Sequence, residues 1–397
     1  MMETPQVLIG LDVGKTAHHA AVITGTGTPL FNRPVAQDET ALRTLFADAT
    51  AHGAPVLVLD QSASIGALPR TIAHALNVPV LYLSGHAFHH VARSFPGQTK
   101  TDQRDASIIA TAGRTMPHAV RSLAPPTPAV ARMRVTNGHL EALTDDISAD
   151  KNRLRSLLLR LHAPLERVLG PRLGQAGVLP LLTTWSTPAA LAAVPDAELH
   201  TFLKQHGSRR ATALVAELRA ALRQQTLVMP ETDALARTLA FRAARCREAV
   251  TEKQRATTEL ETQLAATTHA RQIDTMGGFG TLTIATFLVE TDGKTFATAA
   301  DLASYAGVAP TVRQSGGSRR MQRSRTANTR LKNAMCWAAF SAARSGDAKR
   351  FYEEKRQTKG HWKAVIALAR RRVDVLFAML RDGTDYREPT PPDLTLT

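Results

Sequence analysis

The sequence predicts an α/β domain with a mixed sheet at the N-terminal end, followed by a mainly helical region. Three short apolar runs, at Gln6–Asp12, Val56–Asp60 and Val78–Leu83, have the length and composition of buried strands. Helix-like segments separate the second and third runs, which is the alternation expected of an α/β domain. Beyond Pro125 the apolar residues recur at helical spacing. The 397 residues are enough for two or three domains.

The N-terminal strands are expected to form a hairpin that leads into alternating helices and strands. His18–Ile23 is a second strand candidate, and Gly25–Gly27 supplies its turn. The amphipathic segment Thr40–His52 and the segment Leu68–Leu76 are expected helices. Two of the strands end in a carboxylate, Asp12 and Asp60. Strand ends converge at one edge of such a sheet, where functional sites gather.

Asp102 and Asp105 add two further carboxylates. A helix is expected to start at Thr101 or Asp102, and residues three apart share one face of it. Two like charges at that spacing cost stability unless something positive lies between them. Asp12, Asp60, Asp102 and Asp105 are therefore a candidate metal cluster, and hard oxygen ligands suit Mg²⁺ or Mn²⁺. The alternative is that the strand-end acids cap helices and the Asp102/Asp105 pair only complements a helix dipole.

Pro125, Pro126 and Pro128 indicate a domain boundary. A long helix is expected over Val130–Leu169, because apolar residues recur there every seven positions, at Met133, Leu140, Ile147, Leu154, Leu161 and Val168. This pattern predicts a coiled-coil-like seam, which Asp150 and Pro164 interrupt. Its usual meaning is an oligomer interface or an intramolecular helical hairpin.

Further segments complete the helical region. We expect a loop over Gly170–Pro180, short helices over Pro188–Leu227, and a second long helix over Glu231–Thr268 that could pair with the first. Near Gly278 and Gly280, a Gly-apolar-Gly turn between two helices resembles a helix-hairpin-helix element, whose backbone amides can hold a phosphate.

The C-terminal part is also expected to be mainly helical. Helices are expected over Arg330–Ala343 and His361–Leu380, and the Arg370–Arg372 run is interpreted as a solvated face. The tail Arg387–Thr397 is rich in proline and is expected to be disordered.

The segment from Leu302 to Gly346 contains no Asp or Glu. It carries the cations Arg313, Arg319, Arg320, Arg323, Arg325, Arg330 and Lys332. Such a surface attracts phosphates. A Gly-rich turn within it holds Ser315 and Ser318, and a serine on a flexible loop there could attack a phosphodiester. The alternative is a DNA-docking loop whose serines only contact phosphate.

The bulk composition favours a nucleic-acid partner and excludes several other classes. There are 49 basic and 34 acidic residues, a net charge of +15. An anionic membrane surface is the competing partner, but no basic amphipathic helix with large apolar anchors is evident. The two cysteines exclude a disulfide framework and a cysteine-based zinc site. Because we find no signal peptide and no membrane-spanning run, we expect a cytoplasmic protein.

Three motifs together resemble the DEDD-type insertion-sequence transposases of the IS-one-ten class. They are Gly10-Leu-Asp12-Val-Gly-Lys15 with His18, then Lys100-Thr-Asp102-Gln-Arg-Asp105, and Ala306-Gly-Val-Ala-Pro310 followed by Gln314-Ser315-Gly316. The segment Arg325-Thr-Ala-Asn328-Thr-Arg330-Leu-Lys332 continues the match.

The resemblance implies a site-specific DNA recombinase with three functional segments. Residues 1–124 would form a RuvC-like, RNase-H-fold domain whose acids Asp12, Asp60, Asp102 and Asp105 bind Mg²⁺. Residues 125–270 would form a coiled-coil helical middle for oligomerisation. Residues 271–385 would form a transposase domain with Ser315 as nucleophile, and 386–397 a disordered tail.

The resemblance also implies the partners and the reaction. A structured guide RNA would pair with donor and target double-stranded DNA. The serine would form a 5′-phosphoserine link, and the composite site would span two subunits of a dimer of dimers. Predicted nucleic-acid contacts are Lys15, Lys100, Gly278, Gly280, Arg313, Arg319, Arg320, Arg323, Arg325, Asn328, Arg330 and Lys332.

Two departures from the family pattern stand out. The second acid is usually Glu and here is Asp60, one methylene shorter, so a bound metal would need a shifted carboxylate or a bridging water. Ala327 replaces the usual Gly before Asn328, which would stiffen that turn. Ser318 remains a second nucleophile candidate, although Ser315 occupies the family's Ser-Gly position.

Three other functions remain open from the residues alone. A Holliday-junction-type nuclease would use the four acids with water and leave Ser315 structural. An ATP-using actin-like fold is compatible with Leu11–Lys15, but it requires a second phosphate loop and an adenosine-binding Gly cluster that we do not find. A degenerate, non-catalytic nucleic-acid-binding transposase is compatible with Asp60 in place of Glu.

Overall fold

The computed structural model describes residues 7–61, 64–95, 101–125, 127–315, 318–322 and 327–388, with the backbone alone over 311–315 and 318–322. Internal contacts divide the chain into two compact units. The first unit joins residues 1–128 to 290–332, and the second joins 129–289 to 333–397. Each unit therefore combines segments that are far apart in the sequence. The division at 124, 270 and 385 expected from the sequence stays a prediction.

A six-stranded mixed sheet forms the centre of the first unit. In spatial order β3-β2-β1-β4-β5-β6, its strands are β3 (Pro29–Ala36), β2 (Ala17–Thr24), β1 (Val7–Asp12), β4 (Pro55–Leu59), β5 (Val80–Leu83) and β6 (Val120–Ser122). β1 runs parallel to β4 and antiparallel to β2, and β4 runs parallel to β5. The expected hairpin and mixed sheet are confirmed. The three-residue strand β6 was not predicted.

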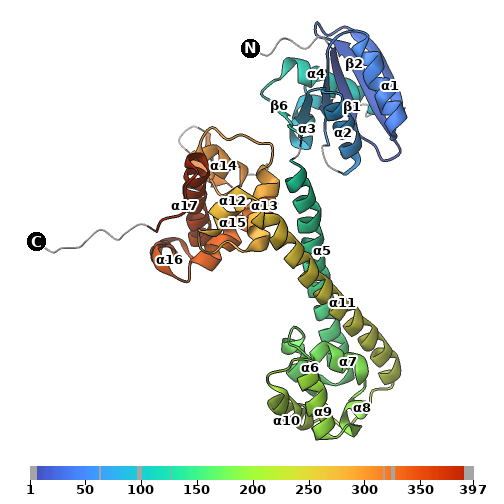
Figure 1. Ribbon diagram of the computed structural model, residues 1–397, viewed down its shortest axis with the longest axis vertical. Coiled ribbons are helices and arrows are strands. Elements are labelled where there is room, and N and C mark those ends of the chain that lie inside the picture. The colour runs from blue at the N-terminus through green and yellow to red at the C-terminus, as the bar shows by residue number, and fades with distance from the viewer. Residues whose placement is uncertain are drawn as a thin grey trace, which may run out of the picture. The chain divides into compact units, whose positions relative to one another are not determined.

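Helices cover both faces of the sheet (Figure 1). On one face lie α1 (Glu39–Thr50) and α2 (Ala67–Ala75), whose apolar residues share a core with Ile9 and Leu11 of β1. On the other face lie α3 (Gly85–Ala92) and α4 (Asp102–Thr115), packed against Leu8 and Val58. Alternate residues of β1 therefore face opposite cores, as the period of a strand requires. The helix α3 was not expected.

Two glycines let α4 lie directly on the sheet. A Cβ on Gly10 would come within 2.3 Å of both the Ala106 carbonyl oxygen and the Ala110 amide nitrogen. A Cβ on Gly113 of α4 would lie 2.4 Å from a methyl group of Val58. Neither position has room for a side chain, so the helix backbone approaches the strands closely. This packing brings the N-terminal turn of α4 to the end of β1.

In the second unit, α5 (Pro128–Leu161) and α11 (Thr232–Ala265) form an antiparallel helical pair. Thr136 bonds to Glu259, and farther along α5 His139 bonds to Glu252. The expected pairing of the two long helices is confirmed. The expected continuity to Leu169 is wrong, because His162 is extended (φ −163°), caps α6 (Ala163–Leu169) with its side chain, and precedes Pro164.

Asp150 is a buried acid in the seam between these helices. It occupies the heptad position of Leu143 and Leu157, and only 1% of its surface is exposed. From α11, Arg242 Nη1 lies 3.0 Å and Arg245 Nε 3.5 Å from its carboxylate oxygens. The residue expected to interrupt the seam is instead an ion-paired part of it.

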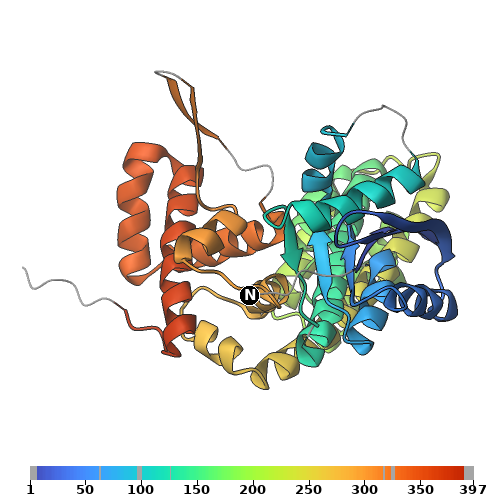
Figure 2. The same ribbon diagram turned by 90° about the horizontal axis from the view of Figure 1, so that it is seen from above.

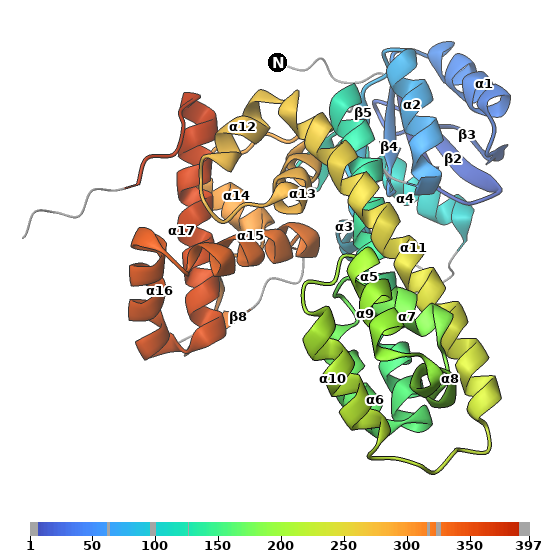
Figure 3. The same cartoon turned by 60° about the horizontal axis from the view of Figure 1, so that its bottom comes forward.

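Short helices gather at one end of the α5/α11 pair (Figure 3). They are α6, α7 (Val178–Thr184), α8 (Pro188–Ala193), α9 (Asp196–Gln205) and α10 (Ala211–Leu222), which share one apolar core with the long helices. The short helices expected over Pro188–Leu227 are confirmed. The loop expected over Gly170–Pro180 is wrong, because η2 (Gly170–Arg172) and the start of α7 occupy it.

The C-terminal half adds α12 (Thr268–Asp274), α13 (Thr281–Thr291), α14 (Ala299–Tyr305), α15 (Thr329–Ala342), α16 (Gly346–Lys359) and α17 (His361–Asp382). The glycine turn between α12 and α13 and the helices α15 and α17 are confirmed. The helix α16 was not expected. Within the described part of the chain, no helix has the length and apolar character needed to cross a membrane.

Candidate functional site

The parallel pairing of β1 and β4 brings two of the predicted acids to one edge of the sheet. Leu11 pairs with Leu59, so Asp12 ends β1 beside Asp60, the residue that follows β4. Both carboxylates are partly buried. This register confirms the prediction that two strands end in acids at the same edge of the sheet.

Asp60 has a carboxylate oxygen that makes no hydrogen bond. Its Oδ1 is buried without a hydrogen-bond partner. Burial raises the pKa of Asp60, and the nearby charge of Asp105 raises it further, while backbone N–H groups, including that of Val13, act in the opposite direction. A buried oxygen without a partner is costly, so a ligand at this position would stabilise the folded chain.

The other two acids lie in the first turn of α4. Thr101 caps this helix, and its hydroxyl accepts the Arg104 amide at 3.2 Å. Asp105 is 7% exposed, whereas Asp102 is exposed. The packing of Gly10 under Ala106 holds this turn at the end of β1. The structure therefore brings Asp105 to Asp60 and leaves Asp102 at the solvent-facing end of the helix.

The acids supply oxygen ligands suited to a metal ion, but the described residues do not form a complete coordination shell. Over the residues described, no three His, Cys, Asp or Glu side chains are arranged to hold a metal ion. Two observations nevertheless fit a cation here. The Oδ1 of Asp60 is a hard oxygen donor without a protein partner, and burial together with the charge of Asp105 disfavours the ionised form of Asp60, an effect that a divalent cation relieves.

His18 fixes the turn that follows Asp12. Its Nδ1 accepts the Gly14 amide at 3.2 Å, so its Nε2 carries the proton and donates to Gln37 Oε1 at 2.5 Å. Burial lowers the pKa of His18. A Cβ on Gly14 would lie 2.1 Å from the Ala17 carbonyl oxygen, so only glycine fits this turn. Lys15 is exposed beside it, and its role as a nucleic-acid contact stays a prediction.

The segment that carries Ser315 is a β-hairpin rather than a flexible loop. β7 (Thr311–Ser315) pairs antiparallel with β8 (Ser318–Gln322), and Figure 2 draws them as a narrow ribbon. Ser315 pairs with Ser318 at the last register position, Arg313 pairs with Arg320, and Gln314 pairs with Arg319. Both serine candidates therefore stand at the same end of the hairpin. The strands are paired where the sequence predicted only a glycine-rich turn.

Four residues, Glu290, Tyr305, Asn328 and Arg330, join segments that precede and follow this hairpin in the sequence. The Asn328 amide donates to the Tyr305 carbonyl at 2.9 Å. The Asn328 side chain donates to Glu290 Oε2 at 2.6 Å and to the Tyr305 hydroxyl at 2.9 Å. Arg330 pairs with Glu290 Oε1 at 3.1 Å. Asn328 and Arg330 thus make intramolecular contacts, and their predicted contacts to nucleic acid stay predictions.

Gly307 lies against Ala327, the residue before Asn328. Its φ is +67°, and an added Cβ would lie 2.5 Å from the Ala327 methyl group and 3.5 Å from Cδ of Lys332. Ala327, which replaces the usual glycine, therefore packs against Gly307.

A buried arginine, Arg372, supports the glycine turn between α12 and α13. Gly278 has φ +94°, and a Cβ there would lie 2.6 Å from the Ala338 carbonyl oxygen, whereas Gly280 faces open space. Arg372 is buried and donates to the carbonyls of Met276 and Gly277. Burial lowers its pKa to about 10. The interpretation of Arg372 as part of a solvated face is wrong, because it supports this turn.

Several predicted contacts lie outside the described residues or are described only by their backbone. Lys100, Arg323 and Arg325 lie outside, as does the tail from residue 389. Glu290, Tyr305 and His18 were missed as site residues. Only His18 had a signal, since it belongs to the first family motif. Glu290 and Tyr305 gain their roles through contacts that span up to 38 residues.

The sheet with its strand-end acids and the basic hairpin are compatible with a DNA-processing enzyme, and the comparisons with known proteins show a transposase. A transposase family of the DEDD type matches residues 9–163, and the transposase IS116/IS110/IS902 family matches residues 270–353. The chain belongs to the IS110 family of transposases, enzymes that act on DNA.

Full-length relatives come from several bacterial insertion elements. The 43.6 kDa protein of insertion element IS110 from Streptomyces coelicolor is 40% identical over 98% of both chains. The 42 kDa protein of IS900 from Mycobacterium paratuberculosis is 34% identical over 97% of this chain and 98% of its own. The 44.8 kDa protein of IS116 from Streptomyces clavuligerus is 32% identical, covering 98% of this chain and 97% of its own.

Proposed function

We propose that this transposase is an RNA-guided, site-specific DNA recombinase that cleaves and rejoins DNA through a phosphoserine at Ser315. The observation that carries the proposal is the position of Ser315 at the end of β7, in a hairpin whose sequence has no acidic residue. The segments before and after the hairpin are joined by the hydrogen bond from Asn328 to Glu290. Such a hairpin attracts a phosphodiester and holds a backbone position for the nucleophile. The strand order of the N-terminal sheet is compatible with an RNase-H-like, RuvC-like fold.

In this proposal Asp12, Asp60, Asp102 and Asp105 hold Mg²⁺, with Mn²⁺ as an alternative. A divalent ion supplies charge stabilisation for the developing oxyanions of phosphoryl transfer. The residues themselves contribute the geometry. Gly10 sets the depth of α4, and the Leu11/Leu59 register sets Asp12 beside Asp60. Asp60, although shorter than the usual Glu, retains an oxygen with no protein partner to meet a ligand.

The proposed cleavage is a transesterification. The Ser315 hydroxyl loses its proton to a base and attacks the scissile phosphorus, because serine is a poor nucleophile until deprotonated. The bond from phosphorus to the 3′-oxygen breaks, and that oxygen leaves as a 3′-hydroxyl after protonation. The serine now carries a 5′-phosphate ester. Attack by the 3′-hydroxyl of the exchanged strand reverses these steps, seals the new phosphodiester and restores the serine.

The partners in the proposal are donor and target double-stranded DNA, a structured guide RNA that pairs with both, and further copies of the chain in a dimer of dimers. The chain's net charge of +15 supports polyanion partners. Lys15, Lys100, Gly278, Gly280, Arg313, Arg319, Arg320, Arg323, Arg325 and Lys332 are the proposed contacts.

Covalent adduct formation tests the nucleophile. The wild-type chain, incubated with a plasmid that carries the element and its flanks, should give a protein–DNA adduct that survives denaturation. Ser315→Ala should abolish the adduct, and the matched change Ser318→Ala should keep it. An adduct retained by Ser315→Ala would remove Ser315 from the mechanism. A chain that cuts DNA with no adduct at all would be a water-using, Holliday-junction-type nuclease.

The guide RNA needs a separate test. The protein should be purified from cells that carry the whole element, and the bound RNA sequenced. A discrete RNA from one flank, with segments that match the element junction and the insertion site, is expected. Random RNA fragments alone would mean that the positive charge binds polyanions without guidance.

A further inference from the structure

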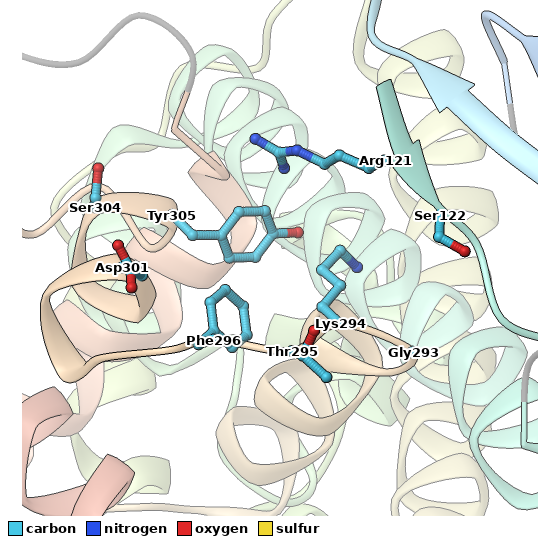
Figure 4. Close-up of a pocket in the computed structure, with 9 residues that line it drawn as sticks. All are labelled: Arg121, Ser122, Gly293, Lys294, Thr295, Phe296, Asp301, Ser304 and Tyr305. Atoms are coloured by element: carbon cyan, nitrogen blue, oxygen red, sulfur yellow. The ribbon is translucent and has the colours of Figure 1, made fainter. Parts of the chain in front are cut away.

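A cavity in the first unit is lined by none of the four predicted acids. It has a volume of about 500 Å³. Its lining comes from β6, from the segment between α13 and α14, and from α14 itself: Arg121, Ser122, Gly293, Lys294, Thr295, Phe296, Asp301, Ser304 and Tyr305 (Figure 4). None of these residues belongs to the predicted sites.

Two aromatic rings form one wall of the cavity. The ring centroids of Phe296 and Tyr305 are 5.5 Å apart, and the rings are tilted by 44°. The Tyr305 ring is fixed, because its hydroxyl donates to the Glu290 carbonyl at 3.1 Å and accepts from Asn328 at 2.9 Å. A preordered aromatic wall is the usual platform on which an unpaired base stacks.

Two cations face the same space. Lys294 Nζ lies 5.5 Å from the centroid of the Tyr305 ring and donates to the Glu290 carbonyl at 2.8 Å. Arg121 extends into the cavity from β6 (Figure 4). The acid Asp301 is drawn on the other side of the rings from Lys294, and its Oδ2 accepts from the Thr298 amide at 3.0 Å and hydroxyl at 2.8 Å. One end of the cavity is therefore suited to a phosphate and the other to the hydrogen-bond donors of a base.

The cavity residue Arg121 has a tyrosine neighbour on the adjacent strand. Arg121 pairs across the strands with Tyr82 of β5. The pKa of the Tyr82 hydroxyl is raised, first by burial and then by the charge of Asp60, while Arg121 lowers it. Tyr82 therefore lies within electrostatic reach of both Asp60 and Arg121.

We propose that this cavity binds one unpaired nucleotide of a nucleic-acid strand, with its base against Phe296 and Tyr305 and its phosphate between Arg121 and Lys294. Duplex nucleic acid does not fit, since its bases are stacked on one another and their faces are covered. The site thus distinguishes single strands, or extruded nucleotides, from paired ones. It does not depend on the serine chemistry.

The test uses the full-length chain and short, fluorescently labelled single strands of thymidine or of uridine, with a duplex of the same length as comparison. Phe296→Leu keeps apolar bulk but removes the ring. It should weaken single-strand binding about tenfold, the size expected for loss of one base–aromatic stack, and leave duplex binding unchanged. Phe296→Trp should restore single-strand binding. Phe241→Leu, which changes an exposed aromatic residue of α11, is the matched control.

Charge and contact are tested independently. Arg121→Gln should lower the slope of log K against log salt for single strands by about 0.7, as expected for one lost phosphate contact. Strands with 5-iodouracil should photocrosslink to the peptide that contains Phe296 and Tyr305. If the uridine strand binds more tightly, the natural ligand is RNA, and if the thymidine strand binds more tightly, it is DNA. The proposal is overturned if Phe296→Leu binds single strands like wild type, if it weakens duplex binding equally, or if the crosslinks map elsewhere.

Discussion

Gly10 contributes to the acid site by having no side chain. Its position in the first family motif could be read from the sequence, but its partner could not, because Ala106 lies 96 positions away in the printed sequence. The backbone of α4 rests where a Cβ would be. Asp105, one residue before Ala106, is buried at the strand end as a result.

Gly10→Ala should therefore both destabilise the chain and disturb the acids. Steric overlap with backbone atoms at 2.3 Å cannot be relieved by a rotamer change, so α4 must shift. We expect a loss of about 1–3 kcal/mol in unfolding free energy, measured by urea denaturation, together with reduced DNA cleavage. Gly85→Ala is the control, since a Cβ there meets nothing within 4 Å and should change stability by less than about 0.5 kcal/mol. Equal effects of the two changes would contradict the packing argument.

His18 gives the first unit a defined pH dependence. Burial lowers its pKa from the ordinary 6.5, so the unfolded chain binds the proton more readily than the folded chain. Stability is therefore complete above pH of about 6.5 and is lost as the pH falls below that value. His18→Gln keeps a hydrogen-bonding side chain without a titrating group, and should flatten the decline in melting temperature between neutral and mildly acidic pH. The exposed His52, changed to Gln, should leave the decline intact. A decline that is the same in His18→Gln and wild type would exclude this histidine as its source.

Single acids at strand ends could be predicted from the sequence because a buried apolar run followed by Asp is a local signal. Asp12 and Asp60 were found in this way. The contacts of Arg372 and Glu290 could not be predicted in this way. Arg372 donates to the Met276 carbonyl, and Glu290 accepts a hydrogen bond from the Asn328 side chain, and both partners lie far away in the sequence. The charge of the Arg370–Arg372 run alone predicted a solvent-facing role for Arg372, and no prediction was made for Glu290.

At the scale of elements, periodicity predicted the longer elements that bury one face, although it missed the short helix α3, whose only buried residue is Val91. The strands of the first unit and the paired helices α5 and α11 follow their apolar patterns. The helix α16 has no buried residue, and β6 has three residues, so neither leaves a periodic signal. The hairpin β7–β8 is polar and basic, and its pairing comes from backbone hydrogen bonds that its composition does not reveal.

The α5/α11 pair offers a test at this scale, because Asp150 replaces an apolar residue of the seam. Asp150→Ala should lose about 1–2 kcal/mol of unfolding free energy, less than for a fully buried pair since Arg242 and Arg245 remain partly exposed and can return to water. Asp150→Leu should recover most of that loss, because an apolar side chain fits the heptad position. Asp145→Ala, an exposed change on the same helix, should be neutral in urea denaturation. If Asp145→Ala costs as much as Asp150→Ala, the buried ion pair is not the cause.

At the scale of the whole molecule, each unit is assembled from two separated segments. The serine hairpin belongs to the same unit as the acid-bearing sheet, although about 200 residues separate Asp105 from Ser315 in the sequence. No local pattern in the sequence predicts this arrangement, because the chain passes from the first unit into the second after residue 128 and returns to the first unit at residue 290. The family match shows a transposase, and the proposal that the serine and the acids work together raises the question of which subunit supplies each of them.

Mixing two inactive chains answers that question. Ser315→Ala and Asp105→Asn should each lower recombination by about 10³-fold or more, because each removes a group that acts on the reacting phosphate. If the working site combines the serine of one subunit with the acids of another, mixed assemblies contain one intact site, and the mixture should recombine a plasmid substrate well above either chain alone. A double variant carrying both changes, mixed with wild type in the same proportion, controls for dilution. A mixture no more active than its parts would place the serine and the acids of each working site on one subunit, and the dimer-of-dimers proposal would lose its catalytic reason.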